Sequence, residues 1–294
     1  MAKPNGPYLP DDYADLTKKG QIKARVHAVS TWKTPDEHVK AWELFRQLYF
    51  LPTKPKFFYK YAVKSSPRAH YQWVHDYMAY QFNIMGGPRH SAKSQVMGRE
   101  IPIFHSLTMP RQDILLILCS NDLMDERFDE LKLQFEENEF LRYDFGRIKP
   151  VGRGRAWRNG KLVLPNGAIL SGTSIESRNR GKHPHEIIID DPEFDPNSKE
   201  GTETKLFRDM QTFLMRVLMP MIEEGEDGRI WWQGTLINRR AALWQAYHGE
   251  DERFEQWNRR LYSMTTKNED GTVDLFWESR WDTNAITRKK ETDG

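Results

Sequence analysis

Hydrophobic and polar positions follow two different patterns along the chain. Short aliphatic runs bounded by polar residues predict buried strands, because a strand covered on both faces has no polar side. Apolar residues that recur every three or four positions predict helices. The predicted strands lie within residues 80–85, 113–120, 186–191, 229–235 and 253–264. The predicted helices lie within residues 36–50, 69–80, 95–101, 122–140, 203–222 and 239–248.

The order of these segments predicts the fold class. Strands alternate with helices over most of the chain, which is typical of an α/β fold with a doubly wound, mostly parallel sheet. Pro165-Asn166-Gly167 between two apolar runs predicts a hairpin over residues 160–172. Residues 1–35 are rich in Pro, Gly, Lys and Asp, and we expect them to form an extended arm. The chain is therefore divided into an N-terminal arm with a helical appendage (1–65), a main domain (66–282) and a C-terminal linker (283–294).

Composition narrows the class of protein. The 294 residues suffice for one large α/β domain with an appendage, and 38% hydrophobic and 29% charged residues predict a globular protein with a polar surface. The net charge is only +2, so any contact with nucleic acid must come from a local patch. No apolar run approaches the roughly 20 residues of a membrane span, and we expect no membrane partner. The single cysteine, Cys119, excludes disulfide and cysteine–zinc scaffolds and fits a reducing cytoplasm.

Residues 87–94 resemble a phosphate-binding loop, the Walker A motif. They read Gly-Pro-Arg-His-Ser-Ala-Lys-Ser, which departs from Gly-x4-Gly-Lys-Ser/Thr only where Ala92 replaces the second glycine. The segment lies between a predicted strand and a predicted helix, as the motif requires. Backbone N–H groups of such a loop cradle phosphates at a helix N-terminus. The candidate nucleotide-binding residues are Gly87, Pro88, Arg89, His90, Ser91, Ala92, Lys93 and Ser94.

Individual residues of this loop have distinct expected roles. Lys93 would reach the β- and γ-phosphates of ATP, and the Ser94 hydroxyl would bind Mg²⁺. Arg89 would sense the γ-phosphate or act on it within the same chain as a catalytic residue. Ala92 adds only a methyl group and is tolerated if its φ is negative, whereas a left-handed φ would cost energy. A chance match in an ordinary loop is the alternative to these roles.

A second motif, of Walker B type, ends the strand predicted at residues 186–191. Three isoleucines lead into Asp190-Asp191-Pro192-Glu193. The carboxyl ends of parallel strands are where ligands bind, so Asp190 is expected beside the phosphate loop as a Mg²⁺ ligand. A second carboxylate would orient and deprotonate the attacking water, and both Asp191 and Glu193 are candidates. The alternative is a strand end capped by acids in a surface turn.

Further stretches add a resemblance to a known family. Arg-Gly and His-Pro precede the acidic strand within residues 171–185, Gln233-Gly234-Thr235 follows a predicted strand, and residues 276–281 read Phe-Trp-Glu-Ser-Arg-Trp. Together with the two motifs above, these stretches resemble the large terminase subunit of tailed bacteriophages over about residues 70–282. That family supplies the ATPase motor that packages viral DNA into procapsids.

The resemblance implies a P-loop NTPase of the ASCE type, the class with an additional strand and a catalytic acid. It implies an ATP- and Mg²⁺-dependent hydrolase that translocates double-stranded DNA. Its implied partners are other copies of itself in a ring, expected to be a pentamer, the portal protein and the small terminase subunit. Its implied place is the host cytoplasm, docked on the procapsid. The family's nuclease domain follows the ATPase domain, and the few acids at the end of this chain do not predict one, so we expect no DNA cleavage.

The resemblance also implies roles for three residues. Arg180 of an adjacent subunit would stabilise charge on the γ-phosphate, with a solvated loop arginine or a DNA contact as alternatives. Thr235 would contact a phosphate-bound water and report hydrolysis, or it satisfies backbone groups at a strand end. Gln72 would read the adenine edge, or it belongs to an ordinary helix.

A basic segment and two rival functions complete the expectations. Residues 147–161 contain several basic residues and no acid, which favours contact with DNA phosphates or with a neighbouring subunit. One rival is a helicase-like translocase, which would need a second motor domain that this chain does not show. The other is an assembly protein that binds a nucleotide without turnover.

Overall fold

The computed structural model describes residues 9–51, 66–152, 156–175, 183–192, 212–213, 216, 218–222, 228–236, 241–248, 252–270 and 272–280. Two residues with predicted roles, Arg180 and Glu193, lie outside the described residues. So do the linker at 283–294 and most of the helix predicted at 203–222.

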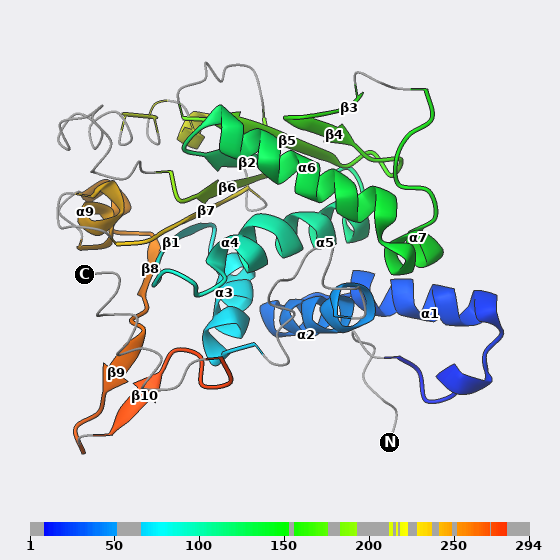
Figure 1. Cartoon of the computed structure of the whole chain (residues 1–294), viewed down its shortest axis with the longest axis horizontal. Coiled ribbons are helices and arrows are strands. Elements are labelled where there is room, and N and C mark those ends of the chain that lie inside the picture. The colour runs from blue at the N-terminus through cyan, green and yellow to red at the C-terminus, as the bar shows by residue number, and fades with distance from the viewer. Residues whose placement is uncertain are drawn as a thin grey trace.

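An eight-stranded sheet forms the centre of the fold, with the strand order β3-β4-β5-β2-β6-β7-β1-β8 (Figure 1). The strands from β5 to β8 in this order are parallel, and β3 and β4 extend the sheet in antiparallel fashion. This confirms the predicted doubly wound, mostly parallel α/β fold and the hairpin at 160–172. The strands are β1 Phe82–Gly86, β2 Asp113–Leu118, β3 Trp157–Arg158, β4 Lys161–Val163, β5 Ile169–Ser174, β6 Glu186–Asp190, β7 Arg229–Gly234 and β8 Asn258–Leu261. Strands β9 Thr265–Lys267 and β10 Val273–Leu275 form a separate antiparallel pair.

One strand separates the two motifs. β7 lies between β1, which leads into the phosphate loop, and β6, which ends in the acids. Gly86 is in register with Gly234, and Asp190 is in register with Gln233. The ends of the three strands therefore meet at one edge of the sheet.

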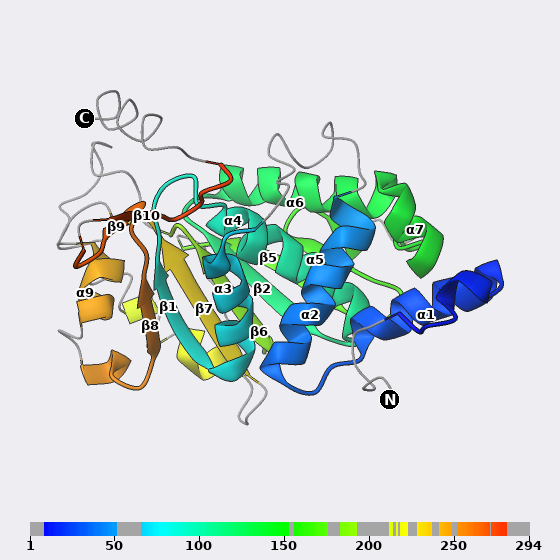
Figure 2. The same cartoon turned by 90° about the horizontal axis from the view of Figure 1, so that it is seen from below.

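Helices cover both faces of this sheet (Figure 2). They are α1 Lys18–Ser30, α2 Pro35–Phe45, α3 Arg68–Ala79, α4 Lys93–Gln95, α5 Ile101–Thr108, α6 Asn121–Glu137, α7 Glu139–Phe145 and α9 Ala242–His248. Buried side chains alternate along the strands, as the period of a strand requires. Ile188 and Trp231 share a core with residues of α2, α3, α5 and α6, whereas Ile187 and Trp232 pack with those of α9. No helix among the described residues is long and apolar enough to cross a membrane.

The N-terminal segment differs from its prediction. The expected extended arm is wrong from residue 18 onward, where helix α1 begins. Thr17 caps this helix by accepting a hydrogen bond from the Gly20 backbone N–H, and Arg25 forms an ion pair with Asp144 of α7. Only Ala28 and Val29 of α1 are buried, so the helix has little apolar periodicity for a sequence pattern to reveal. The contact with α7 supports it instead.

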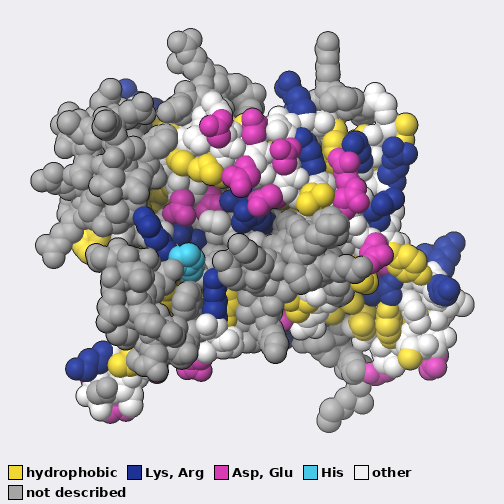
Figure 3. Space-filling view, viewed as in Figure 1, with side chains coloured by type: hydrophobic (Ala, Val, Ile, Leu, Met, Phe, Trp, Pro, Cys, Tyr) yellow, Lys and Arg dark blue, Asp and Glu magenta, His cyan; other side chains and the backbone are white. Residues whose placement is uncertain are grey.

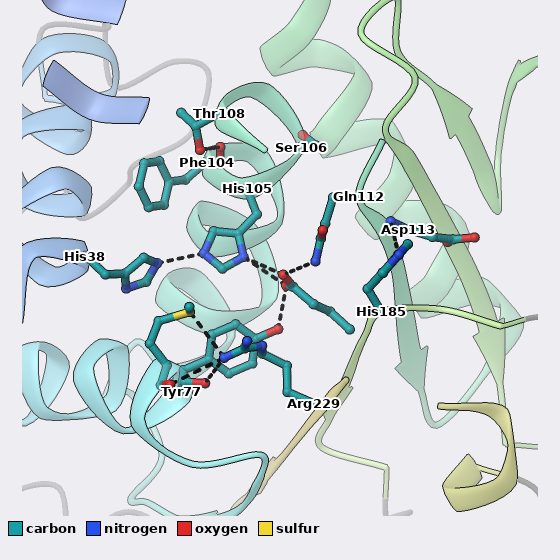
Figure 4. A network of polar contacts seen from close by, with 12 residues as sticks. His38, Tyr77, Phe104, His105, Ser106, Thr108, Gln112, Asp113, His185 and Arg229 are labelled. Atoms are coloured by element: carbon teal, nitrogen blue, oxygen red, sulfur yellow. Dashed lines mark hydrogen bonds and ion pairs between the residues drawn. The ribbon is translucent and has the colours of Figure 1, made fainter. Parts of the chain in front are cut away.

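A buried polar network fastens helix α2 to the sheet (Figure 4). The Glu186 carboxylate at the start of β6 accepts hydrogen bonds from Tyr77 Oη (2.6 Å), Gln112 Nε2 (2.7 Å) and His105 Nδ1 (2.9 Å). His105 Nε2 lies 2.7 Å from His38 Nε2 on α2. His38, Tyr77, His105 and Glu186 are all fully buried. The helical appendage and the sheet are therefore joined by groups that water does not reach.

Candidate nucleotide-binding and hydrolysis site

The phosphate loop connects β1 to α4 and is held from two sides. His70 on α3 contacts the Ser91 carbonyl through Nε2 at 2.7 Å, and Arg280 donates from Nη1 to the His90 carbonyl at 2.9 Å. Burial lowers the pKa of His70 to about 3, so the ring is neutral and Nε2 carries the proton that it donates to the carbonyl. The loop is thus shaped by side chains from a preceding helix and from a segment far along the chain.

Backbone strain concentrates at this site. Among the described residues, four that are not glycine have a positive φ, and three of them are His90 (63°), Ala92 (63°) and Asp191 (43°). Ala92 therefore does not meet the condition of a negative φ under which its methyl group is tolerated without cost. A left-handed conformation costs such a residue about 1–2 kcal/mol. Strain of this kind persists where the surroundings impose it, and it gathers at functional sites.

The Lys93 side chain is buried and lies between two acceptors. Its Nζ donates to Thr235 Oγ1 at 2.7 Å and lies 3.2 Å from Asp191 Oδ2. The Thr235 backbone N–H in turn donates to Asp191 Oδ1 at 2.9 Å. The structure thus brings together a lysine after β1, an aspartate after β6 and a threonine after β7, which the sequence assigned to three separate motifs.

Asp190 has a complete set of partners. Its Oδ1 accepts from Ser94 Oγ at 2.9 Å and from Gln233 Nε2 at 2.7 Å, and its Oδ2 lies 3.1 Å from Arg127 Nη2. Burial works against ionisation of Asp190, but the Arg127 charge and the hydrogen bonds from Gln233 and Ser94 outweigh it and hold the pKa of Asp190 below its usual value. The carboxylate is therefore ionised at neutral pH and oriented toward Ser94.

Asp191 has the opposite character. Its side chain is 44% exposed. Desolvation at the strand end raises the pKa of Asp191, and the negative charge of Asp190 adds to this effect against the lowering influence of Lys93. An accessible carboxylate with a raised pKa suits a general base.

A cavity of about 230 Å³ adjoins the phosphate loop. Lys93 and Ser94 line it together with Arg46, Trp277 and Arg280. The Arg280 guanidinium lies 5.0 Å from the centre of the Trp277 ring, and both residues belong to the segment 276–281 that the sequence singled out. The residue proposed to read adenine, Gln72, is not among the lining residues.

Gln72 and Arg89, two other predicted residues that the structure describes, stand apart from this cluster. The Gln72 amide donates to Asp76 Oδ1 at 2.7 Å, and the Arg89 side chain is exposed at the tip of the loop. In the basic segment, Lys149 forms an ion pair with Glu136, and residues 153–155 lie outside the described residues. Acidic side chains gather over α6 in the space-filling view (Figure 3).

Sequence reasoning missed Arg127. This residue lies on α6 among many charged side chains, yet it is only 7% exposed and contacts Asp190. A signal was present: Arg127 precedes Phe128 and lies between Met124 and Leu131, on the apolar stripe of an amphipathic helix. A charged residue on such a stripe must find a partner when the helix packs.

The donor set fits a metal held jointly with a ligand. Among the residues that the structure describes, no group of three or more His, Cys, Asp or Glu side chains could hold a metal ion. Ser94 and Asp190 do present adjacent oxygen atoms beside the phosphate loop. Mg²⁺ is commonly bound by one or two protein oxygens together with substrate phosphates, so these residues suit that ion.

The strand order, the loop and the acidic strand end are those of a P-loop NTPase fold. Among solved structures, the chain is similar to the crystal structure of the HK97 bacteriophage large terminase, with a TM-score of 0.57 and 13% sequence identity. The match covers 89% of this chain and 52% of that chain, so this chain spans about half the length of the HK97 protein. At this identity the similarity establishes the fold. No protein-family model matches the sequence, and no curated protein matches it.

Proposed function

We propose that this chain is an ATP-hydrolysing motor domain of the large-terminase type, which uses ATP and Mg²⁺ to move double-stranded DNA. The observation that carries the proposal is the meeting of Lys93, Asp191 and Thr235, each at the end of a different parallel strand or of the loop that follows it. The motifs in the sequence and the similarity to the HK97 large terminase support the same conclusion.

The phosphate loop would bind the triphosphate through its backbone N–H groups and through Lys93. Lys93 now has Asp191 and Thr235 as acceptors, and a phosphate would compete for the same ammonium group. Transfer of Lys93 to the phosphate would free the Asp191 carboxylate to accept a proton from water. Nucleotide binding and activation of the base would then be one coupled event.

Ser94 and Asp190 would hold Mg²⁺, which when bound neutralises developing charge on the phosphate oxygens. The Gln233 amide keeps the Asp190 carboxylate oriented toward Ser94. Asp191 is our candidate for the base, and Glu193 is its alternative. Arg180 would come from an adjacent subunit, Arg89 from the same chain, and Thr235 would pass the state of the phosphate to β7.

The cellular role follows from the same proposal. A ring of subunits, the portal protein and the small terminase subunit would be the partners in packaging viral DNA in the host cytoplasm. The basic segment 147–161 would contact the DNA backbone or a neighbouring subunit, because such contacts depend on charge rather than on base sequence.

The test is ATP hydrolysis by the wild type, by Lys93→Ala and by Lys19→Ala, each with and without linear double-stranded DNA. Lys19 is an exposed lysine on α1, a helix that contributes no residue to the cavity beside the phosphate loop, and it serves as the matched control. We expect Lys93→Ala to lower the rate about 100- to 1000-fold, as does loss of other groups that stabilise transition-state charge, and Lys19→Ala to leave it unchanged. Equal rates for all three proteins would overturn the proposal. Nucleotide binding without hydrolysis in the wild type would favour the assembly-protein alternative instead.

A further inference from the structure

Arg127 is held in a narrow place between α6 and the backbone that follows the phosphate loop. Its Nη1 donates to the Gly98 carbonyl at 2.9 Å, and its Nη2 lies 3.1 Å from Asp190 Oδ2. Its Nε lies 3.5 Å from Glu130 Oε2 and is buried without a hydrogen bond. The guanidinium is therefore aimed at the Asp190 carboxylate and is incompletely satisfied elsewhere.

The backbone at Gly98 makes room for this contact. A Cβ atom at position 98 would collide with Arg127 Nη1 and Asp190 Oδ2, so a side chain there would push the guanidinium and the carboxylate out of their present positions. Gly98 belongs to a π-helical segment, Val96–Glu100, directly after α4. Local π-helical geometry often marks functional sites. The helix is wider at this π-helical segment, and Gly98 has no side chain there. The Arg127 guanidinium occupies the space beside Gly98.

The contact places a cation on the carboxylate proposed to bind Mg²⁺. Asp190 Oδ1 is occupied by the neutral donors Ser94 and Gln233, whereas Oδ2 carries the one ion pair that Asp190 makes within the described residues. A carboxylate that is already neutralised by a guanidinium attracts a divalent cation less strongly, because the two positive charges repel each other. Arg127 and Mg²⁺ would therefore compete for one negative charge.

We propose that Arg127 is an internal counter-cation that competes with Mg²⁺ for Asp190 and thereby sets the Mg²⁺ concentration at which the site loads. The inference rests on the proposed nucleotide–Mg²⁺ site. When the metal is absent, Arg127 keeps Asp190 ionised and oriented. When the metal binds, the guanidinium shifts toward Glu130, which lines the adjacent cavity of about 190 Å³ together with Arg127. Arg127 is therefore a positioning residue: it orients the Asp190 carboxylate and determines how readily the site takes up Mg²⁺.

The test is a titration of the full chain with Mn²⁺, a paramagnetic substitute for Mg²⁺, followed by electron paramagnetic resonance in the presence of ADP. The wild type is compared with Arg127→Gln and with Arg99→Gln. Arg99 lines the same cavity but pairs with Glu130, at 2.5 and 2.8 Å, rather than with Asp190, so it is the matched control. We expect Arg127→Gln to lower the Mn²⁺ dissociation constant about tenfold, which corresponds to about 1.4 kcal/mol. Arg99→Gln should change the constant less than about twofold, because the Arg99 charge is paired with Glu130 rather than with Asp190.

Three results distinguish the possible failures. An Mn²⁺ dissociation constant that is unchanged or raised in Arg127→Gln overturns the competition while leaving the nucleotide site intact. Absence of Mn²⁺ binding to the wild type with ADP overturns the proposed function and the inference with it. If circular dichroism shows that Arg127→Gln is unfolded, Arg127→Lys takes its place: a shorter, single-point ammonium should compete less well and lower the constant about threefold, and an unchanged constant overturns the proposal.

Discussion

The two ends of β6 carry the same kind of group in two different settings. Glu186 is the first residue of this strand and Asp190 the last, and with Ile188 between them they face the same side of the sheet. Both carboxylates are buried, and both accept several hydrogen bonds. For Glu186, burial is outweighed by His105, which holds its pKa at about 2, and the pKa of Asp190 is lowered in the same direction. By burial and ionisation alone the two acids are hard to tell apart.

The difference lies in access to a cavity. The partners of Glu186 are fully buried or part-buried groups on α3, on α5 and in the segment before β2, where Arg111 also has a positive φ. Asp190 borders a cavity and is followed directly by Asp191, whose φ is positive, and it faces a loop with strained residues. A buried, paired acid is therefore weak evidence for a reactive site. An acid whose partners could be exchanged for a ligand, at a strained strand end open to a cavity, is stronger evidence.

The strongest test of the difference between Glu186 and Asp190 replaces each acid with its isosteric amide and compares the stability of the two variants. Glu186→Gln should lower the free energy of unfolding by about 3–5 kcal/mol, because the donors from His105, Tyr77 and Gln112 would face one acceptor and an opposing amide in a closed space. Asp190→Asn should cost only about 1–2 kcal/mol, because Arg127 lies beside a cavity that can hydrate it. Urea unfolding measures both values. Equal losses of unfolding free energy in the two variants would show that hydration of Arg127 from the cavity does not offset the loss of the Asp190 charge.

Acid titration sharpens the comparison further, since each end holds a buried histidine. Burial lowers the pKa of His38, in the buried polar network around Glu186, well below its usual value. Burial also lowers the pKa of His70, beside the phosphate loop, to about 3. The unfolded chain, with histidine pKa values near 6.5, binds more protons below that pH, so stability should be full above pH 6.5 and fall as the pH drops. By pH 5.5 the two residues together should cost about 3 kcal/mol.

Urea unfolding at pH 7.5 and 5.5 checks this expectation. His70→Gln keeps a donor for the Ser91 carbonyl and should reduce the difference between the two pH values by about 1.4 kcal/mol. The contribution of Glu186 appears only at lower pH, as the pH falls below about 4.5 toward its lowered pKa of about 2. A His70→Gln variant with the full wild-type difference would argue against a neutral His70 in the folded protein.

The smallest expected effect concerns strain at the loop. Ala92→Gly should raise the free energy of unfolding by about 0.5–1 kcal/mol, because glycine accepts a φ of 63° without steric cost, although its unfolded chain is more flexible. Ala79, an exposed residue with helical conformation at the end of α3, is the control, and Ala79→Gly should destabilise slightly. Thermal unfolding measures both changes. Loss of stability in Ala92→Gly would mean that the loop conformation imposes no penalty on alanine.

The sequence was sufficient to predict the sheet and the meeting of the motifs at one edge. Five aliphatic or aromatic runs of strand length, separated by helical patterns, imply parallel strands, and the carboxyl ends of such strands lie together. Predicted strands end at, or shortly before, all five residues of the site, so their proximity follows from the topology alone: Lys93, Ser94, Asp190, Asp191 and Thr235. The roles proposed for Arg180 and Glu193 stay predictions, because these residues lie outside the described part of the chain.

What escaped prediction depends on contacts between distant segments. Helix α1 is supported by the ion pair between Arg25 and Asp144, and the local spacing of its apolar residues does not predict a helix. The buried polar network joins His38, His105 and Glu186 from three separate elements. The left-handed Ala92 follows from a loop shaped by His70 and Arg280. Such features are set by tertiary packing, which can override local propensity.

The position of β7 has a consequence for the distance between two charged groups of the site. Gln233 reaches the Asp190 carboxylate, and Thr235, two residues further along the same run of backbone, reaches the Lys93 ammonium. Two residues of extended chain span about 7 Å. The backbone of β7 and of the residue after it therefore sets the spacing between the Asp190 carboxylate and the Lys93 ammonium, because that spacing depends on the fixed length of the peptide units. Such an interval would survive repacking of the hydrophobic core, but not the insertion or deletion of a single residue in this strand.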